Sequence, residues 1–198
     1  MTGNYGVVIL PDENTIAKAY EIAQATLPSD AEYVLRSGLL PHLTLYHAPL
    51  ASVPVSFART VLVELNNNLS GRNIVLDRVA SFKGFFLFWY AAHPKLNDIL
   101  RESHRVALKL SRFRDRQNRT SDVLSGKILT TPQELLNIEG YGHPWVADSF
   151  SPHITLGYDA SLDFKVPYRI RQRWDMTIKS VSLARIGRLG IIEEIVDV

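Results

Sequence analysis

The stretch PHLTL at residues 41–45 recurs as PHITL at residues 152–156, with isoleucine in place of leucine at the third position. After its proline, each stretch alternates polar and apolar side chains, which is the pattern of a β-strand with one buried face. We call each stretch a PHxTL motif. Because successive side chains of a strand point to opposite sides, the histidine and threonine of each motif are predicted to share the face away from the core. These polar residues are His42, Thr44, His153 and Thr155.

The segments around the first PHxTL motif give a regular order of predicted elements. A helix is predicted to start after Asp12, a favourable N-cap residue, because apolar residues follow at helical spacing. A second helix is predicted to open at Ser52 and Pro54 and to end in the sequence NNNLSG. The order is therefore strand, helix, motif strand, helix, strand. The predicted ranges outside the motif include a strand at 5–10, the first helix at 13–26 and a strand at 73–82.

The segments around the second PHxTL motif follow the same order. A strand is predicted in FFLFWYAA at 85–92, and a helix is predicted from Pro94 to about residue 111. A longer connection at 112–150 then precedes the motif, and it contains a capping box from Thr131 to Glu134 at the start of a short helix. The remaining predicted elements are a helix at 166–173 and the hairpin strands 178–186 and 190–197.

The repeated order of elements favours a duplicated fold. No Gly/Ser-rich or Pro-rich linker divides the chain, so the two halves are expected to pack together. We predict one bilobal domain over residues 1–198, with approximate lobes at 1–82 and 85–198. The extended connection at 112–150 is then an addition within the second lobe.

Composition limits the classes of protein to which this chain can belong. The chain has 198 residues and no cysteine, which excludes disulfides, a thiolate nucleophile and a zinc–cysteine site. Its formal net charge of +2 is too small to indicate nucleic-acid binding by itself. The N-terminal sequence MTGNYGVVILPDEN is typical of a first strand rather than a signal peptide, and no apolar run reaches the roughly 18 residues of a membrane span. We expect a soluble, cytoplasmic monomer.

Basic residues recur along the helix predicted after Pro94. Their spacings of four, four, three and four place them on one helix face. A solvated face opposite the apolar face of this helix is the favoured interpretation. A contact with the RNA backbone is the alternative, and it is carried by the same basic stripe. The residues of the stripe are Arg101, Arg105, Lys109, Arg112 and Arg116.

Two histidines and two threonines on matching strands suit chemistry at a phosphodiester. A neutral imidazole can take the proton from an attacking oxygen, and an imidazolium can donate a proton to the leaving oxygen. Both forms are accessible near neutral pH because the unperturbed pKa of histidine is about 6.5. Threonine hydroxyls can hold the non-bridging oxygens as charge develops. Two copies of a short motif with proline before and leucine after it are expected by chance in far fewer than about one chain in a thousand.

The paired motifs His42-Leu-Thr-Leu and His153-Ile-Thr-Leu resemble the signature of the two-histidine (2H) phosphoesterase superfamily, which includes the 2'-5' RNA ligase-like proteins and cyclic nucleotide phosphodiesterases. The resemblance implies a bilobal α+β fold, with two antiparallel sheets facing each other across a central cleft and helices on the outside. It also implies metal-independent action on 2',3'-cyclic phosphates or 2'-5' linkages, without a cofactor. By this resemblance His42 and His153 are the acid/base pair, and Thr44 and Thr155 hold the phosphate.

The residues that follow the motifs are placed by the same alternation of faces. Tyr46 is expected on the face of His42, where it either stacks on a base or borders the site, and Gly157 takes that place in the second strand. His47 is expected on the opposite face from His42. A metal site that combines these two histidines is therefore not expected, and no carboxylate lies close to them in the sequence.

Two other activities remain open from the sequence. Ligation of RNA ends through a 2'-5' linkage is the reverse of cleavage and requires the same residues. A non-catalytic module that binds RNA or a nucleotide would hold a phosphate at the motifs without turnover, and it would use the basic stripe for the backbone. The connection at 112–150 is longer than the usual link in the 2H superfamily, which leaves the choice of substrate undetermined.

Overall fold

The structure of the protein, a computed structural model, describes residues 1–91, 94–117, 131–160 and 169–198. Its strands pair antiparallel in an eight-stranded sheet with the order β1-β3-β6-β5-β4-β7-β8, and β2 pairs with β6. The strands are β1 (Gly3–Pro11), β2 (Tyr33–Val34), β3 (Leu43–Leu50), β4 (Asn73–Phe82), β5 (Phe86–Tyr90), β6 (His153–Tyr158), β7 (Arg169–Ile186) and β8 (Ile192–Val196). The two PHxTL motifs lead into β3 and β6.

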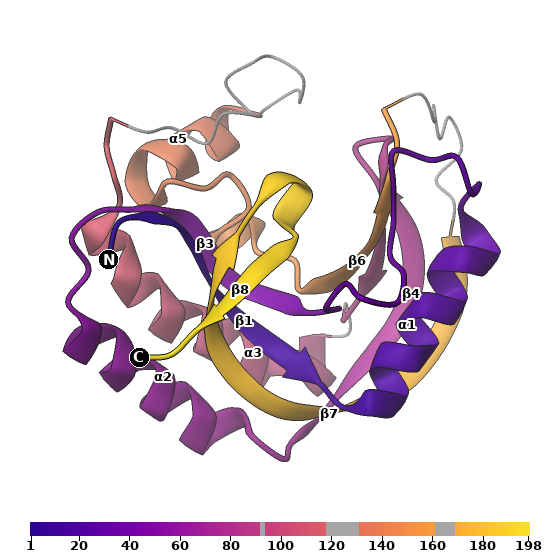
Figure 1. The fold of residues 1–198 in the computed structure, drawn as a ribbon, viewed down its shortest axis with the longest axis horizontal. Helices are drawn as coiled ribbons and strands as arrows, with labels where there is room; N and C mark the ends of the chain where they lie inside the picture. The colour runs from indigo at the N-terminus through magenta and orange to yellow at the C-terminus, as the bar shows by residue number, and fades with distance from the viewer. Residues whose placement is uncertain (92–93, 118–130, 161–168) are drawn as a thin grey trace.

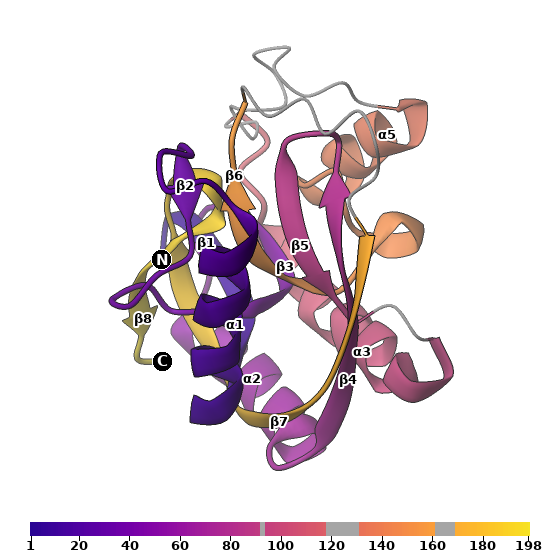
Figure 2. The same ribbon diagram turned by 90° about the vertical axis from the view of Figure 1, so that its right-hand side faces the viewer.

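Four α-helices lie in the described ranges: α1 (Glu13–Thr26), α2 (Val55–Leu69), α3 (Pro94–Ala107) and α5 (Pro132–Tyr141). Three short 3-10 helices accompany them: η1 (Leu108–Phe113), η2 (Ala147–Ser149) and η3 (Arg188–Gly190). None of the described helices is long and apolar enough to cross a lipid bilayer. The protein thus combines an antiparallel sheet with helices around it, which confirms the α+β class (Figures 1 and 2).

Two of the predicted helix starts are confirmed by their caps. The Asp12 carboxylate accepts a hydrogen bond from the backbone N–H of Thr15, which satisfies a free donor in the first turn of α1. A second oxygen of Asp12 accepts from the N–H of Thr177 on β7 and ties the start of α1 to the sheet. The capping box of Thr131 and Glu134 is also present at the start of α5.

The long strand β7 makes the sheet continuous. Its first part, from Arg169 to Thr177, pairs with β4, and its second part, from Ile178 to Arg185, pairs with β1. Figure 1 shows β7 curving beneath the molecule between these two partners. The strands therefore form one sheet rather than two separate sheets. The helix predicted at 166–173 is wrong from residue 169 onward, because pairing with β4 holds that segment as strand, and residues 166–168 lie outside the described ranges.

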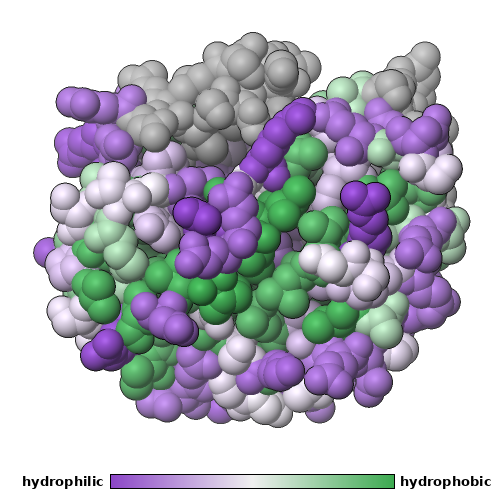
Figure 3. All heavy atoms as spheres, in the orientation of Figure 1, coloured by the Kyte–Doolittle hydropathy of each residue, from purple (hydrophilic) through white to green (hydrophobic). Residues whose placement is uncertain are grey.

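One face of the sheet carries the main hydrophobic core. The main core lies between one face and helices α1, α2 and α3, and it includes the apolar residues of both PHxTL motifs. Leu43 and Ile154 have no exposed surface, as their strand positions predict. Burying each such side chain stabilises the fold by roughly 1.5–3 kcal/mol, so the register of both motif strands is strongly fixed. In the view of Figure 1, apolar residues lie across the middle of the surface and hydrophilic residues gather around its outline (Figure 3).

Candidate active site

Both motif strands contain a β-bulge at the leucine that ends the motif. On β3, Thr44 pairs with Val8 and Tyr46 pairs with Val7, so Leu45 is the extra residue. On β6, Thr155 pairs with Phe88 and Gly157 with Leu87, so Leu156 is the extra residue. A bulge of this kind changes the face to which the following residues point. The alternation of faces therefore reverses after each motif, at the same position in both strands.

The bulges overturn the predicted position of Tyr46. Its side chain is only 2% exposed and packs in the main core, on the face opposite to His42. Its hydroxyl donates a hydrogen bond to the carbonyl of Tyr141 at the end of α5, at 2.7 Å. Burial raises the pKa of Tyr46 above its ordinary value. Tyr46 therefore neither stacks on a substrate nor borders the site, because the bulge at Leu45 turns it inward.

Gly157, the equivalent residue of β6, is also turned to the core face. A Cβ atom at this position would lie 1.8 Å from Cδ1 of Leu27, at the end of α1. Close approach of Leu27 to the strand therefore requires glycine here. The prediction that Gly157 lies on the face of His153 is wrong for the same reason as that for Tyr46.

His47 and Tyr158 instead lie on the face of His42 and His153, opposite to the main core, which we call the site face. His47 pairs with Gly6 on β1, and Tyr158 pairs with Phe86 on β5. The prediction that His47 lies opposite His42 is thus wrong, because the bulge shifts the phase of the strand by one residue. The His47 ring lies 4.1 Å from the ring of His143, between centroids. A polar or aromatic residue five positions after the motif histidine in both strands is the only sequence signal that pointed to these two residues.

The two motif strands meet at their central residues. Leu43 of β3 is paired antiparallel with Ile154 of β6. Counting outward from this pair places His42 next to Thr155 and Thr44 next to His153, all on the face opposite to the main core. The two histidines are then diagonal neighbours, for which the separation is about 7–8 Å and the Cβ atoms lie somewhat closer. The structure thus brings the four predicted residues together on neighbouring strands of one sheet.

Each motif histidine is oriented by the backbone two residues before it. Nδ1 of His42 bonds the carbonyl of Leu40 at 2.9 Å, and Nδ1 of His153 bonds the carbonyl of Ser151 at 2.7 Å. A carbonyl can only accept, so Nδ1 is the donor in both rings. A neutral ring with its proton on Nδ1 has its lone pair on Nε2, the nitrogen that can accept a proton from a substrate.

Burial shifts the titration of these histidines downward. It lowers the pKa of His153 to about 4, while the Ser151 carbonyl acts in the opposite direction and nearby His42 lowers the pKa further. Burial also lowers the pKa of His42, against the effect of hydrogen bonds with the backbone of Leu40 and Gly190. Both rings are therefore neutral near pH 7 in the free protein, and mutual repulsion disfavours charging both at once.

The same cause acts on the neighbouring histidines. Burial lowers the pKa of His47 to about 4, and His42 and His153 lower it further. Burial likewise holds the pKa of His143 well below its ordinary value, with contributions from His47, His153 and His104. Among the residues that the structure describes, no group of three or more His, Asp or Glu side chains is arranged to hold a metal ion.

Aromatic side chains line the site face beside His153. Phe88 stacks on the His153 ring at 3.7 Å between centroids, and Tyr90 lies 5.9 Å away. Phe86 continues the row and contacts Tyr158 at 4.9 Å. These residues alternate along β5 and β6 with the core residues, as a strand with two buried faces requires. The result is an apolar wall that shields one side of His153 from water.

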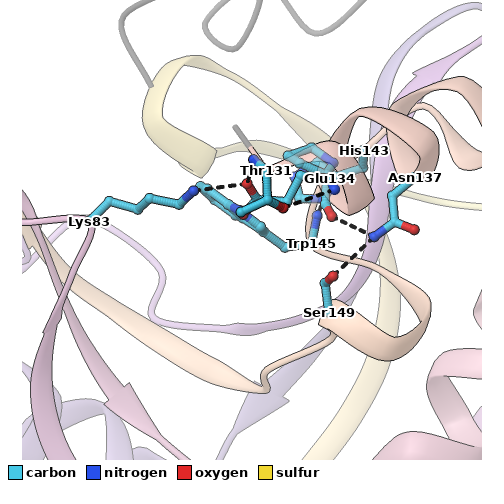
Figure 4. Close-up of polar contacts among 8 residues, drawn as sticks. Lys83, Thr131, Glu134, Asn137, His143, Trp145 and Ser149 are labelled. Atoms are coloured by element: carbon cyan, nitrogen blue, oxygen red, sulfur yellow. Dashed lines mark hydrogen bonds and ion pairs between the residues drawn. The ribbon is translucent and has the colours of Figure 1, made fainter. Parts of the chain in front are cut away.

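A polar network holds α5 and the loop that follows it in place (Figure 4). The Glu134 carboxylate of α5 accepts hydrogen bonds from Nζ of Lys83 at 2.9 Å and from Nε1 of Trp145 at 3.0 Å. The Trp145 ring packs edge-on against Phe82 at 4.9 Å. Asn137 donates hydrogen bonds to the carbonyls of the loop after α5. The connection predicted at 112–150 thus contributes ordered residues, including His143, to the site face.

His104 joins the first motif strand to the segment that precedes the second. Its side chain is 2% exposed, and its Nδ1 donates to the carbonyl of Leu45 at 2.6 Å. Its Nε2 accepts a hydrogen bond from the N–H of Ala147 at 2.8 Å, in the segment that leads to β6. The ring stacks on Phe150 with centroids 4.0 Å apart. The carbonyl of the second bulge residue, Leu156, accepts instead from the N–H of Leu35.

The basic stripe along α3 and η1 lies away from the site face. Lys109 forms an ion pair with Glu64 of α2 at 2.7 Å. The Arg112 guanidinium lies over the ring of Phe57 at 5.5 Å. Arg101 and Arg105 are exposed. Because α3 packs on the main-core side of the sheet, these contacts join helices and do not reach His42 or His153.

Comparison with known proteins gives a fold but no family. No family model matches the chain, and no curated protein matches its sequence. A crystal structure of a phosphoesterase is similar in fold, with a TM-score of 0.52 and 15% identity, and the match covers 100% of this chain and 97% of the other. The chain therefore has the fold of a phosphoesterase. At this identity the likeness concerns the fold alone.

Proposed function

We propose that the protein is a metal-independent phosphodiesterase of the two-histidine (2H) type, acting on 2',3'-cyclic phosphates or on 2'-5'-linked nucleotides or RNA. The pairing of Leu43 with Ile154 carries the proposal, because it gathers two histidines and two threonines on one face. If the motif were repeated by chance, its two copies would not be expected to lie on neighbouring strands. The fold shared with a phosphoesterase agrees with this chemistry.

His42 and His153 are proposed to act as a general base and a general acid. One Nε2 takes the proton from the attacking hydroxyl or water, and the other ring gives a proton to the leaving oxygen. In the free protein both pKa values are lowered, so the acid must gain its proton when the anionic substrate binds. A bound phosphate raises the pKa of an adjacent imidazole. The hydroxyls of Thr44 and Thr155 hold the non-bridging oxygens.

We also propose that the fold arose by duplication into lobes near residues 1–82 and 85–198. Both motif strands share the bulge at the leucine and the bond from Nδ1 to the carbonyl two residues earlier. Such agreement in local geometry favours two copies of one unit. The PHxTL motif then marks equivalent positions in the two lobes.

Two rival activities use the same site. Ligation through a 2'-5' linkage is the reverse reaction and needs the same acid and base. A non-catalytic module that binds RNA or a nucleotide is favoured by one observation: both motif histidines have lowered pKa values, so no proton donor is present before a ligand binds. Turnover decides between the enzyme and the module.

The direct test is incubation with 2',3'-cyclic nucleotides, 2'-5' dinucleotides and RNA ending in a cyclic phosphate, with EDTA present throughout. We expect at least one substrate to be converted. His42→Ala and His153→Ala should each reduce the rate by a factor of about 100 to 10,000. The double variant should be impaired much less than the product of the single effects, because the pair acts as a unit.

Matched variants separate chemistry from folding. Thr44→Val and Thr155→Val should each cost less than a histidine variant, since one donor of a partly redundant pair is lost. Thr60→Val, on the exposed face of α2, should leave the rate unchanged. A folded His153→Ala protein that retains full activity would contradict the assignment. Absence of turnover on every substrate would favour the binding module, and activity that EDTA abolishes would contradict the metal-independent step.

A further inference from the structure

A row of four residues crosses the sheet from β7 to the candidate active site. Arg171 pairs with Arg78 on β4, Arg78 pairs with Tyr90 on β5, and Tyr90 pairs with His153 on β6. Directly paired residues of neighbouring strands share a face of the sheet. The Arg78 guanidinium lies over the Tyr90 ring at 4.9 Å, and the Tyr90 ring lies 5.9 Å from that of His153. Two arginines therefore stand on the site face, in line with His153.

Neither arginine has an acidic partner among the residues that the structure describes. In the part of the chain that the structure describes, neither Arg78 nor Arg171 forms an ion pair, and the buried Nε of Arg78 has no hydrogen-bond partner. Like charges directly opposite each other in a sheet are destabilising, and so is a buried donor without an acceptor. By contrast, Arg185 on the same β7 strand pairs with Glu193 and Glu194. An anionic ligand that contacts both guanidinium groups would supply the missing counter-charge.

The distance along the row distinguishes this anion from the reacting phosphate. Two strand spacings, about 10 Å, separate the backbone of Arg78 from that of His153. Tyr90 lies between them, and the Arg78 guanidinium lies over its ring at 4.9 Å. Arginine recognises phosphate with two parallel hydrogen bonds, which its planar fork allows. A substrate that reaches from the histidines to Arg78 can therefore present a second phosphate there, beyond the one that reacts.

We propose that Arg78 and Arg171 form a second phosphate-binding subsite, so that preferred substrates carry a phosphate beyond the reacting one. This inference rests on the proposed function at His42 and His153. The second phosphate is either the terminal monophosphate of a nucleotide or the neighbouring phosphodiester of an oligonucleotide. Both sources present the same chemistry to the arginines, and different substrates distinguish them.

The test compares three substrates: adenosine 2',3'-cyclic phosphate, its 5'-phosphorylated form, and a dinucleotide ending in a cyclic phosphate. We expect wild-type kcat/KM to be higher for one or both substrates with a second phosphate. Arg78→Ala should reduce that preference about ten- to hundredfold, mainly through KM, because a charge-assisted pair of hydrogen bonds is lost. Its activity on adenosine 2',3'-cyclic phosphate should change much less. Preference for the monophosphate or the dinucleotide identifies the source.

Three further variants guard the test against a folding artefact. Arg171→Ala changes an exposed side chain and should lower the same preference even if Arg78→Ala is unstable. Arg78→Lys keeps the charge but not the planar fork, so it should restore only part of the preference. Arg59→Ala, on the exposed side of α2, is the matched control and should alter neither value.

A binding measurement tests the phosphate subsite separately from the proposed phosphodiesterase activity. Titration of folded His153→Ala protein with adenosine 3',5'-bisphosphate and with adenosine 5'-monophosphate needs no turnover. The subsite is supported if the bisphosphate binds more tightly than the monophosphate and if adding Arg78→Ala removes this difference. This result would support the subsite even if no substrate is converted, and only the proposed function would then fail. Conversion with equal preference in wild type, Arg78→Ala and Arg171→Ala overturns the subsite and leaves the proposed function standing.

Discussion

Replacing His104 by phenylalanine should destabilise the protein through the bulge of the first motif strand. The aromatic volume next to Phe150 is kept, so little cavity forms. Two hydrogen bonds are lost, however: a buried one to the carbonyl of Leu45 and a partly buried one from the N–H of Ala147. A buried polar group left without its partner costs about 1–3 kcal/mol. We therefore expect the free energy of unfolding at neutral pH to fall by about 2–6 kcal/mol.

The pH dependence of that loss gives a specific signature. Burial lowers the pKa of His104 to about 4, the Leu45 carbonyl acts in the opposite direction, and Arg101 and Arg105 lower it further. The unfolded chain, with a pKa of about 6.5, therefore binds the proton first as pH falls. Neutral His104 contributes its full share to the free energy of unfolding above about pH 6.5. About 3 kcal/mol of this contribution is lost as the pH falls from about 6.5 to about 4. The wild type and His104→Phe should converge by that amount.

Urea unfolding at about pH 7, 5.5 and 4 measures this convergence. Two further variants separate the two bonds: His104→Asn can still donate to Leu45, and His104→Gln can still accept from Ala147. Neither variant titrates in this range, so both should show the weakened pH dependence of His104→Phe. A constant difference between wild type and His104→Phe across the three pH values would refute the assignment of His104 as a buried neutral link.

The other predictions address the motif face and the helices. The lowered pKa values of His42 and His153 move both limbs of a bell-shaped pH profile to lower pH. We therefore expect kcat/KM to be highest below about pH 6.5. An optimum above about pH 7 would contradict this prediction. Tyr46→Phe should cost about 1 kcal/mol of stability and leave kcat unchanged, since its hydroxyl binds a carbonyl in the core; a large loss of kcat with a normal melting temperature would return Tyr46 to the site. If Arg101 and Arg105 contact an RNA backbone, replacing both by alanine should reduce the slope of log Kd against log salt by about two, and an unchanged slope assigns them to a solvated face.

The elements with local signals were predictable from the sequence. Helix α1 begins after Asp12 because a short polar side chain caps the first turn, and α5 begins with the capping box of Thr131 and Glu134. Strand β4 and the hairpin of β7 and β8 follow from alternation and turn residues. In each case the signal and its effect lie within a few residues of each other. The α+β class follows from these elements together.

The positions that failed depend on partners distant in sequence. Alternation places Tyr46 on the site face and His47 behind it, but β1 and β3 pair with a bulge at Leu45 that reverses both. Local periodicity predicted a helix near 170, whereas pairing with β4 holds that segment as strand. Neither a bulge nor a neighbouring strand leaves a mark in the local sequence that alternation can detect.

The sequence by itself determined that two histidines and two threonines stand on one side of two similar strands, because the apolar residues between them must be buried. Only the tertiary structure decided that the strands are neighbours, paired at Leu43 and Ile154, and that His47 and Tyr158 join them. The tertiary structure also aligned Arg78 with His153 across three strands. The physical reason is that a side chain's face is a property of one strand, whereas its neighbours are set by the register among strands far apart in the chain.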